Sequence, residues 1–296
     1  MQEQLFRSVL VPVYASETSA MFFLLLLVIE ASVSVGTESA SFEPYELNGG
    51  LVSAVAGRRF GIVAADTRMF GPGGYLLNSR DHLAGRLWGA MDNALLQDLE
   101  GILRKSDGNR KEEDITFSCQ EPPIFIGAAG CSADCQALQL NTRADLRAAN
   151  YFYLTGEELT NSPTSRKKKA SEVATVLGQI LYLRRGFPYY CFCVVSAIGK
   201  AYVYDAIGSY EEVAVATAGT GREALQPILD RAFSTTSSQK QVTETVEQAV
   251  QIIYHAYRAV SEREIGVGDK LVLCVSEEKK DGVATCRVII LPLKEH

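Results

Sequence analysis

Two alternating apolar segments that meet at a tight turn constrain the fold of this chain more than any other feature. Residues 51–56 (LVSAVA) and 60–66 (FGIVAAD) are joined by Gly57-Arg58-Arg59. Two short runs of strand-forming residues around a glycine-containing turn are typical of a β-hairpin. Asn48-Gly49-Gly50 precedes the first strand, and Asp66-Thr67-Arg68 ends the second. The folded part of the chain is therefore predicted to open with a hairpin that ends at a carboxylate.

Downstream of the hairpin, the periodicity predicts strands, then helices, then strands, then helices, then strands. Further strands are expected at residues 75–77, 124–128, 189–198, 201–205, 211–217, 271–276 and 283–291. Helices are expected from Ser132, as the N-cap, to about Tyr151, along the face formed by Val173, Val176, Leu177, Ile180 and Leu181, at residues 221–232, and along the stripe Val246, Val250, Ile253, Tyr257 and Val260. This order of elements supports a mixed α/β domain.

The composition limits the function classes that remain. The 296 residues carry a formal net charge of −6, which argues against nucleic acid because its phosphates favour a basic protein surface. The seven cysteines are odd in number, and several lie in apolar strand-like runs, which is typical of reduced, buried thiols in a cytosolic protein. The three histidines have no paired-ligand spacing. No metal and no cofactor are therefore expected.

An apolar run near the N-terminus needs a separate interpretation. Residues 21–29 (MFFLLLLVI) are too few to span a bilayer as a helix, so no membrane partner is expected. The run has the length of a signal-peptide core and is followed by small residues at 31–36, but Arg7 is the only positive charge ahead of it. We favour an N-terminal extension or propeptide over residues 1–47. A signal peptide and a mis-assigned start codon stay open.

The hairpin and its flanks resemble the start of a proteasome β-type subunit. In this family, processing after a Gly exposes an N-terminal Thr, whose hydroxyl attacks a peptide carbonyl while its own amine takes the proton. That Thr begins the first strand about sixteen residues ahead of the Asp, and the same distance ahead of Asp66 lies Gly50. Gly50 has no nucleophilic atom, and its neighbours Leu51 and Val52 do not supply one. The resemblance therefore implies a catalytically silent chain.

The other catalytic parts of the family are also missing. Active members carry a Lys about sixteen residues after the Asp, but residues 51–104 contain no Lys, and the sequence around the expected place offers an Arg, Arg86, instead. Because Arg does not release its proton in a protein, it would hold an ion pair without tuning a proton transfer. Arg222 and Val267 stand where the family has serines, and Glu264 stands where it has Asp. We therefore assign no catalytic residue, no cofactor-binding residue and no metal ligand.

Later motifs resemble the non-catalytic beta type-1 branch of the family, at the sixth position of the β ring. They are residues 42–50 (FEPYELNGG), 181–190 (LYLRRGFPYY), 205–210 (DAIGSY) and 225–230 (LQPILD). The resemblance assigns a proteasome β-type domain to residues 48–296. It implies an α+β fold, a four-layer αββα sandwich of the N-terminal nucleophile hydrolase type.

The resemblance also implies what the chain does. It would be a structural β subunit of the 20S proteasome core particle, needed for ring assembly and for ubiquitin-dependent protein degradation in the cytoplasm and nucleus. Its implied partners are neighbouring β subunits, α-ring subunits and the opposite β ring. Two other functions stay open: an active hydrolase of this type processed at Ser53 or Thr67, and a secreted enzyme behind a signal peptide. Neither Ser53 nor Thr67 has the family's spacing to Asp66.

An insertion interrupts the resemblance at about residues 89–121. Within it, Leu95, Leu99 and Ile102 lie at helical spacing, and residues 105–114 (KSDGNRKEED) are predicted to form a solvated loop because seven of these ten are charged. The charged half of the insertion is either disordered or a contact with a ring neighbour or regulator. Arg184 and Arg185 are likewise either a surface helix end or part of a subunit contact.

Overall fold

The predicted hairpin is present, and each of its strands is paired on both sides within a six-stranded antiparallel sheet. In this computed structural model, the described residues are 45–71, 76–78, 86–90, 113–119, 122–154, 170–233, 245–278 and 284–293. The strand order is β11-β1-β2-β12-β13-β6. These strands are β1 (Leu51–Gly57), β2 (Phe60–Asp66), β6 (Glu113–Cys119), β11 (Val215–Gly219), β12 (Lys270–Glu278) and β13 (Ala284–Pro292). Ala54 of β1 lies opposite both Val63 of β2 and Ala216 of β11.

A second antiparallel sheet has five strands in the order β10-β9-β8-β7-β5. Its members are β5 (Leu87–Gly89), β7 (Phe125–Gly130), β8 (Cys191–Ala197), β9 (Lys200–Tyr204) and β10 (Tyr210–Val213). Two short strands, β3 (Met69–Phe70) and β4 (Leu76–Asn78), pair separately from both sheets.

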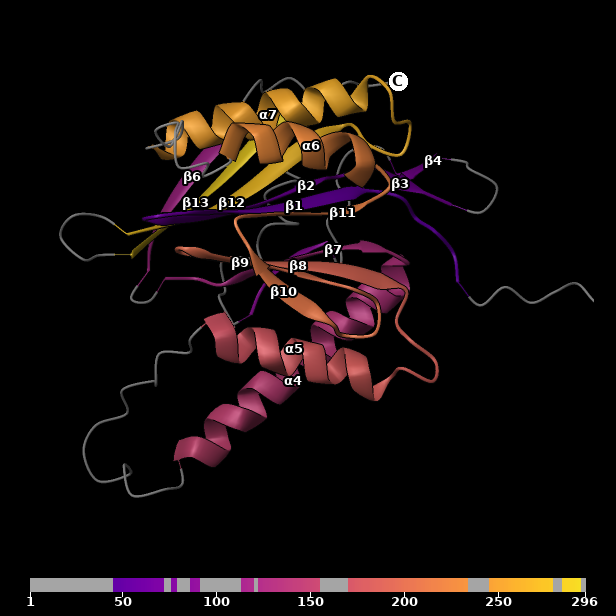
Figure 1. The fold of residues 1–296 in the computed structure, drawn as a ribbon, viewed down its shortest axis with the longest axis vertical. Helices are drawn as coiled ribbons and strands as arrows, with labels where there is room; N and C mark the ends of the chain where they lie inside the picture. The colour runs from indigo at the N-terminus through magenta and orange to yellow at the C-terminus, as the bar shows by residue number, and fades with distance from the viewer. Residues whose placement is uncertain are drawn as a thin grey trace, which may run out of the picture. The chain divides into compact units, whose positions relative to one another are not determined.

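Four helices in the described residues cover the outer faces of the two sheets (Figure 1). They are α4 (Ser132–Leu154), α5 (Ala170–Leu183), α6 (Arg222–Phe233) and α7 (Val246–Ser261). Helices α6 and α7 pack on the six-stranded sheet, and α4 and α5 pack on the five-stranded sheet. The two sheets pack face to face on each other. The result is an α+β fold in which both sheets are antiparallel.

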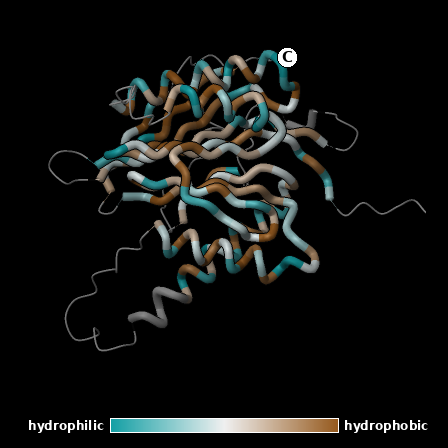
Figure 2. Tube along the Cα trace, in the orientation of Figure 1, coloured by the Kyte–Doolittle hydropathy of each residue, from teal (hydrophilic) through white to brown (hydrophobic). Residues whose placement is uncertain are grey.

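These layers explain why both alternating sets of residues in the hairpin are apolar. Leu51 and Val55 pack toward α6 and α7, whereas Val52 and Ala54 pack toward the other sheet. Figure 2 shows hydrophobic residues running along the strands between the layers. Because each strand face is covered, each face removes apolar area from water, which is the main favourable term in folding.

The helical stripe predicted for α7 is confirmed. Its members Val246, Val250, Ile253, Tyr257 and Val260 are all buried. Thr245 begins the helix as its N-cap, because its side chain accepts a hydrogen bond from the N–H of Gln248 at 3.3 Å. Most of the stripe predicted for α5 is buried as well, with Val176 only partly covered.

The single strand predicted at residues 211–217 is wrong. Tyr210–Val213 (β10) pairs with β9 in the five-stranded sheet, and Val215–Gly219 (β11) pairs with β1 in the six-stranded sheet. The side chains of Glu211 and Glu212 are exposed on an edge strand, whereas residues 215–218 are buried. The chain therefore passes from one sheet to the other at Ala214, a change that the local pattern of strand-forming residues does not reveal.

The last part of the segment assigned to the insertion is also a strand. Residues 113–119 form β6, which pairs with β13 at the edge of the six-stranded sheet. A carboxylate oxygen of Asp114 accepts from Arg287 of β13 at 2.6 Å, and Arg287 also contacts Glu247 of α7 at 3.1 Å. The predicted solvated loop therefore ends before Glu113.

Several predictions concern segments outside the described residues. They are the apolar run at 21–29, the helix around Leu99 and most of the charged loop after it. Tyr45, which the sequence places in the extension, lies within the described part and packs on the domain: its hydroxyl donates to Pro188 O at 2.6 Å. No helix among the described residues is long and apolar enough to span a membrane.

Replacing Tyr257 with Phe tests the packing of α7 on the hairpin. The buried Tyr257 hydroxyl lies 3.1 Å from both Ala64 O and Ser53 Oγ, so its loss leaves buried polar atoms without a partner. We expect the free energy of unfolding to fall by about 1–2 kcal/mol. Hydrogen exchange of peptides from β1 and β2, followed by mass spectrometry, measures the change.

The matched control is Tyr254→Phe on the same helix. The Tyr254 hydroxyl donates to Pro292 O at 3.3 Å in an exposed position, where water replaces the lost bond. Equal exchange in the two variants would contradict the structural role of the Tyr257 hydroxyl.

Candidate functional site

The site begins at the carboxylate that ends the hairpin. The Asp66 side chain is fully buried, and one of its oxygens, Oδ1, accepts from the N–H of Leu51 at 2.9 Å and from Arg86 Nη1 at 2.5 Å. The other oxygen, Oδ2, accepts from the N–H of Gly268 at 3.1 Å. Asp66 therefore joins the start of β1, the end of β2, the segment before β5 and the loop before β12.

Arg86, the cation that the sequence analysis considered in place of the family's Lys, forms an ion pair with Asp66. Besides the carboxylate, its guanidinium donates to the backbone carbonyls of Asp66, at 2.9 Å, and Arg68. Burial raises the pKa of Asp66, and it is opposed by the Arg86 charge and by the two backbone N–H donors. Since Arg keeps its proton, this pair stabilises structure without offering a proton to a reaction.

At Gly50, which the resemblance places at the family's nucleophile position, there is no room for a side chain. Its φ is +96°, a conformation that residues with a Cβ rarely adopt. A Cβ at this position would lie 2.2 Å from Cζ of Arg86 and 2.4 Å from its Nη2. The carbonyl of Gly50 is held by the N–H of Thr220 at 3.0 Å. The guanidinium of Arg86 thus fills the space that a side chain at residue 50 would need.

The two residues that the resemblance places at the family's serine positions, Val267 and Arg222, lie in different surroundings. Val267 is fully buried in the core beneath α6 and α7, and its neighbour Gly268 reaches Asp66 through a backbone N–H. Arg222 is exposed at the start of α6. The Glu264 side chain accepts from the N–H of Gly266 at 3.2 Å, within its own loop.

The two alternative nucleophiles considered from the sequence are both buried. Ser53 lies in the middle of β1, between Ala64 of β2 and Thr217 of β11, and its Oγ contacts the Tyr257 hydroxyl. Thr67 is buried just after β2, and its Oγ1 accepts from the N–H of Lys270 at 3.1 Å. Both hydroxyls therefore belong to hydrogen-bond networks of the core.

The sequence reasoning missed a second buried ion pair beside the first. Arg68 Nη2 donates to Asp269 Oδ1 at 2.9 Å, and Nη1 donates to Ile265 O at 3.1 Å. Asp269 has a φ of 67°, in the left-handed region. The sequence shows Arg68 two residues after the end of the buried strand β2 and Asp269 directly before the buried strand β12. Their pairing, however, depends on β2 and β12 lying side by side.

Asn48, just ahead of the hairpin, holds the start of α4. Its Oδ1 accepts from the N–H of Ser132 at 2.7 Å, and its Nδ2 donates to Phe70 O at 2.8 Å. The sequence predicts Ser132 as the N-cap, but in the structure Ser132 is the first residue of the helix. Its backbone N–H is satisfied by Asn48, 84 positions earlier in the chain.

The cysteines form part of the core rather than of a reactive site. All seven are free, and all but Cys119 are buried. Cys135 Sγ lies 3.1 Å from Cys191 Sγ. Burial raises the pKa of Cys191, and it raises that of Cys286 to about 12, so these sulfurs stay protonated and weakly reactive. Within the described ranges, no group of three or more His, Cys, Asp or Glu residues could hold a metal ion.

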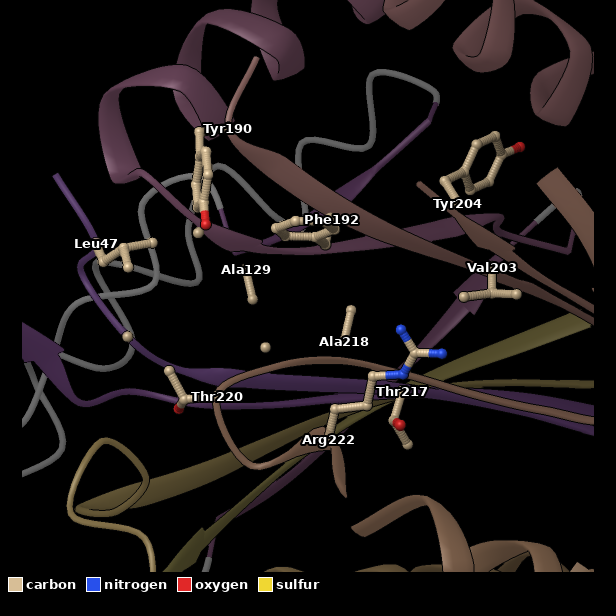
Figure 3. Close-up of a pocket in the computed structure, with 13 residues that line it drawn as sticks. Leu47, Ala129, Tyr190, Phe192, Val203, Tyr204, Thr217, Ala218, Thr220 and Arg222 are labelled. Carbon is tan, nitrogen blue, oxygen red and sulfur yellow. The ribbon is translucent and has the colours of Figure 1, made fainter. Parts of the chain in front are cut away.

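An open cavity of about 270 Å³ lies beside Gly49, between the ends of the two sheets (Figure 3). Its lining is mostly apolar, and Arg222 is the only charged residue among the described residues that line it. The lining residues are Leu47, Gly49, Ala129, Gly130, Tyr190, Phe192, Val203, Tyr204, Thr217, Ala218, Gly219, Thr220 and Arg222. A second pocket, on the side of Arg86, Ala128 and Ser132, has a volume of only about 10 Å³. An apolar group can therefore enter the cavity beside Gly49 but not the pocket beside Arg86.

Comparison with known proteins gives one family and a consistent set of relatives. The model of the proteasome subunit family matches residues 116–275. Proteasome subunit beta type-1-B of Carassius auratus is 30% identical over 267 residues, which cover 88% of this chain and 92% of the relative. Proteasome subunit beta type-1 of Arabidopsis thaliana is 28% identical, covering 84% and 95%. A probable proteasome subunit beta type-6 of Schizosaccharomyces pombe is 28% identical, covering 86% and 98%.

Replacing Gly50 with Ala tests whether Arg86 excludes a side chain. The added Cβ meets the guanidinium and imposes a left-handed φ on Ala, so we expect a loss of roughly 2–4 kcal/mol in the free energy of unfolding. The melting temperature, measured in the complex from which the chain is purified, gives the size of the effect.

Gly49→Ala is the matched control. Gly49 also has a positive φ, but its nearest neighbours to an added Cβ lie at 3.6 Å, an ordinary contact distance. We expect it to cost only about 1 kcal/mol. If Gly50→Ala were no worse than Gly49→Ala, the steric role of Arg86 would be refuted.

Proposed function

This chain belongs to the proteasome subunit family, as a β-type subunit, and within that family we propose that it is a non-catalytic structural subunit of the 20S core particle. The observation that carries the proposal is the geometry at Gly50, where the Arg86 guanidinium fills the space of a nucleophilic side chain. The position offers only backbone atoms to a substrate carbonyl, so it cannot form an acyl-enzyme bond.

The cation beside Asp66 supports the same proposal. A catalytic amine or hydroxyl needs a neighbour that can shift its pKa or exchange a proton with it. A guanidinium bound to Asp66 and to two backbone carbonyls has a fixed charge and fixed geometry. Asp66 in this chain therefore acts as a counterion that joins four segments.

The proposed structural role has three parts. The domain, residues 48–296, would adopt the αββα sandwich of the N-terminal nucleophile hydrolases, which the covered outer faces of both sheets support. It would complete the β ring, wall the proteolytic chamber and support the substrate pockets of catalytic neighbours during ubiquitin-dependent degradation in the cytoplasm and nucleus. Residues 1–47 would be an N-terminal extension or propeptide.

The surface after α5 supports a subunit contact. Tyr182, Leu183 and Phe187 are more than half exposed, a concentration of large apolar side chains that is costly in water. Arg184 lies over the ring of Tyr189 and Arg185 over the ring of Tyr182, at 5.4 and 4.5 Å from the ring centres. We place this junction against another subunit of the particle, with neighbouring β subunits, α-ring subunits and the opposite β ring as the full set of partners.

A covalent probe tests the absence of catalysis. Incubation of the purified particle with a threonine-directed epoxyketone should modify the catalytic β subunits and leave this chain unmodified, because Gly50 has no side-chain oxygen. Mass spectrometry of each subunit gives the result, and the modified neighbours are the internal control. An adduct on any of residues 50–55 would contradict the proposal.

Depletion of the chain tests the structural role. Because a closed ring needs every subunit, depletion should lower all peptidase activities of the particle together and reduce the amount of assembled particle on native gels. Expressed alone, the chain should be poorly soluble or form non-native assemblies, since permanent interfaces are large and apolar. Loss of a single specificity, or a stable monodisperse monomer, would count against the proposal.

A further inference from the structure

The open cavity beside Gly49 is not explained by a purely structural role. Its upper wall comes from the five-stranded sheet, with Ala129, Tyr190 and Phe192, and its lower wall from the six-stranded sheet and the turn after it, with Ala218 and Thr220 (Figure 3). A domain that only fills a place in a ring gains stability by closing such a gap, because a void forfeits packing contacts. The gap is instead open and lined mainly by apolar groups.

Two polar groups face this apolar space. The Arg222 side chain extends toward the cavity, and the hydroxyl of Tyr190 points toward it (Figure 3). Among the described residues, neither the Arg222 guanidinium nor the Tyr190 hydroxyl has a hydrogen-bond or ion-pair partner. The Tyr190 ring is fixed by an edge-to-face contact with Phe192, with ring centres 5.6 Å apart. A cation and a hydroxyl are thus positioned beside an apolar surface.

We propose that this cavity binds the carboxyl-terminal residue of a peptide whose last side chain is aliphatic or aromatic. In the described part of the lining, Arg222 is the only charged residue, so the cavity favours an anion, and a guanidinium matches a carboxylate with two parallel hydrogen bonds. A carboxyl-terminal residue carries its carboxylate and its side chain on one Cα. The first group meets Arg222 while the second enters the space beside Phe192 and Val203.

The size of the cavity selects a short occupant. At about 270 Å³ it is slightly smaller than the ~300–1,000 Å³ of sites for drug-sized ligands, so it suits one or two residues. An Asp or Glu side chain would satisfy Arg222 but leave the apolar walls uncovered. The bound residue would not be cleaved, because Gly50 supplies no nucleophile. This inference rests on the proposed function in one respect: the peptides would come from the proteolytic chamber.

Photocrosslinking on the assembled particle tests the proposal. The probe is an acetylated tripeptide that ends in a diazirine-bearing leucine analogue, prepared with a free carboxylate and, separately, with a carboxamide. The catalytic subunits are first blocked with an epoxyketone. We expect crosslinks on Phe192, Val203 or Ala218, with the acid giving about fivefold more than the amide, as a partly exposed ion pair allows.

Variants on α6 identify the group that recognises the carboxylate. Arg222→Gln should reduce crosslinking by the acid to the level of the amide, and Arg222→Lys, which keeps the charge but not the two parallel hydrogen bonds, should restore only part of it. Arg231→Gln, which removes a positive charge in the last turn of the same helix, should leave the preference for the acid intact. Equal labelling by acid and amide in the unmodified chain, an unchanged preference in Arg222→Gln, or crosslinks only outside the cavity would overturn the proposal.

The outcomes separate this inference from the proposed function. An epoxyketone adduct on this chain would refute the proposed function, and so would the absence of this chain from the particle. If the chain is absent from the particle, the same crosslinking experiment on the tagged, purified chain still decides the inference. A particle that contains the unmodified chain but shows no preference for the acid refutes the inference alone.

Discussion

A guanidinium and a carboxylate, both removed from water, meet where the opening hairpin ends, and the neighbouring segments are built around them. Arg86 and the N–H groups of Leu51 and Gly268 all point at Asp66, so two strand ends and a distant loop share one anion. Removing either partner of such a pair leaves an uncompensated buried charge, at a cost of about 3–5 kcal/mol. The pair therefore fixes the local backbone whether or not a reaction takes place there.

The pair also determines what residue 50 can be. Because Arg86 is held by three acceptors at once, it cannot move aside without leaving its own charge or the buried carbonyls unsatisfied. A residue with a Cβ at position 50 would need that movement. The presence of Arg86 and the absence of a side chain at residue 50 therefore depend on each other, because a shorter side chain in place of Arg86 would leave space at residue 50.

The sequence predicted those features that depend on local pattern or on spacing along the chain. The hairpin, the buried stripe of α7 and the ion pair between Asp66 and Arg86 belong to this class. The partnership of Arg68 with Asp269 was not predicted, because it depends on two strands about 200 residues apart in sequence lying side by side. The change of sheet at Ala214 was missed for a related reason: periodicity indicates a strand but not which sheet receives it.

The two pockets near the start of the hairpin differ in how they depend on Arg86. On one side, Arg86 leaves a pocket of only about 10 Å³. On the other side, the walls are strands of two different sheets, whose separation is set by packing between the sheets at residues such as Val52 and Val194, away from Arg86. Substitutions around Asp66 therefore leave the larger cavity unaffected. Arg222 adds a cation to that cavity without filling it, so the proposed absence of catalysis and the proposed binding of a peptide terminus depend on different residues.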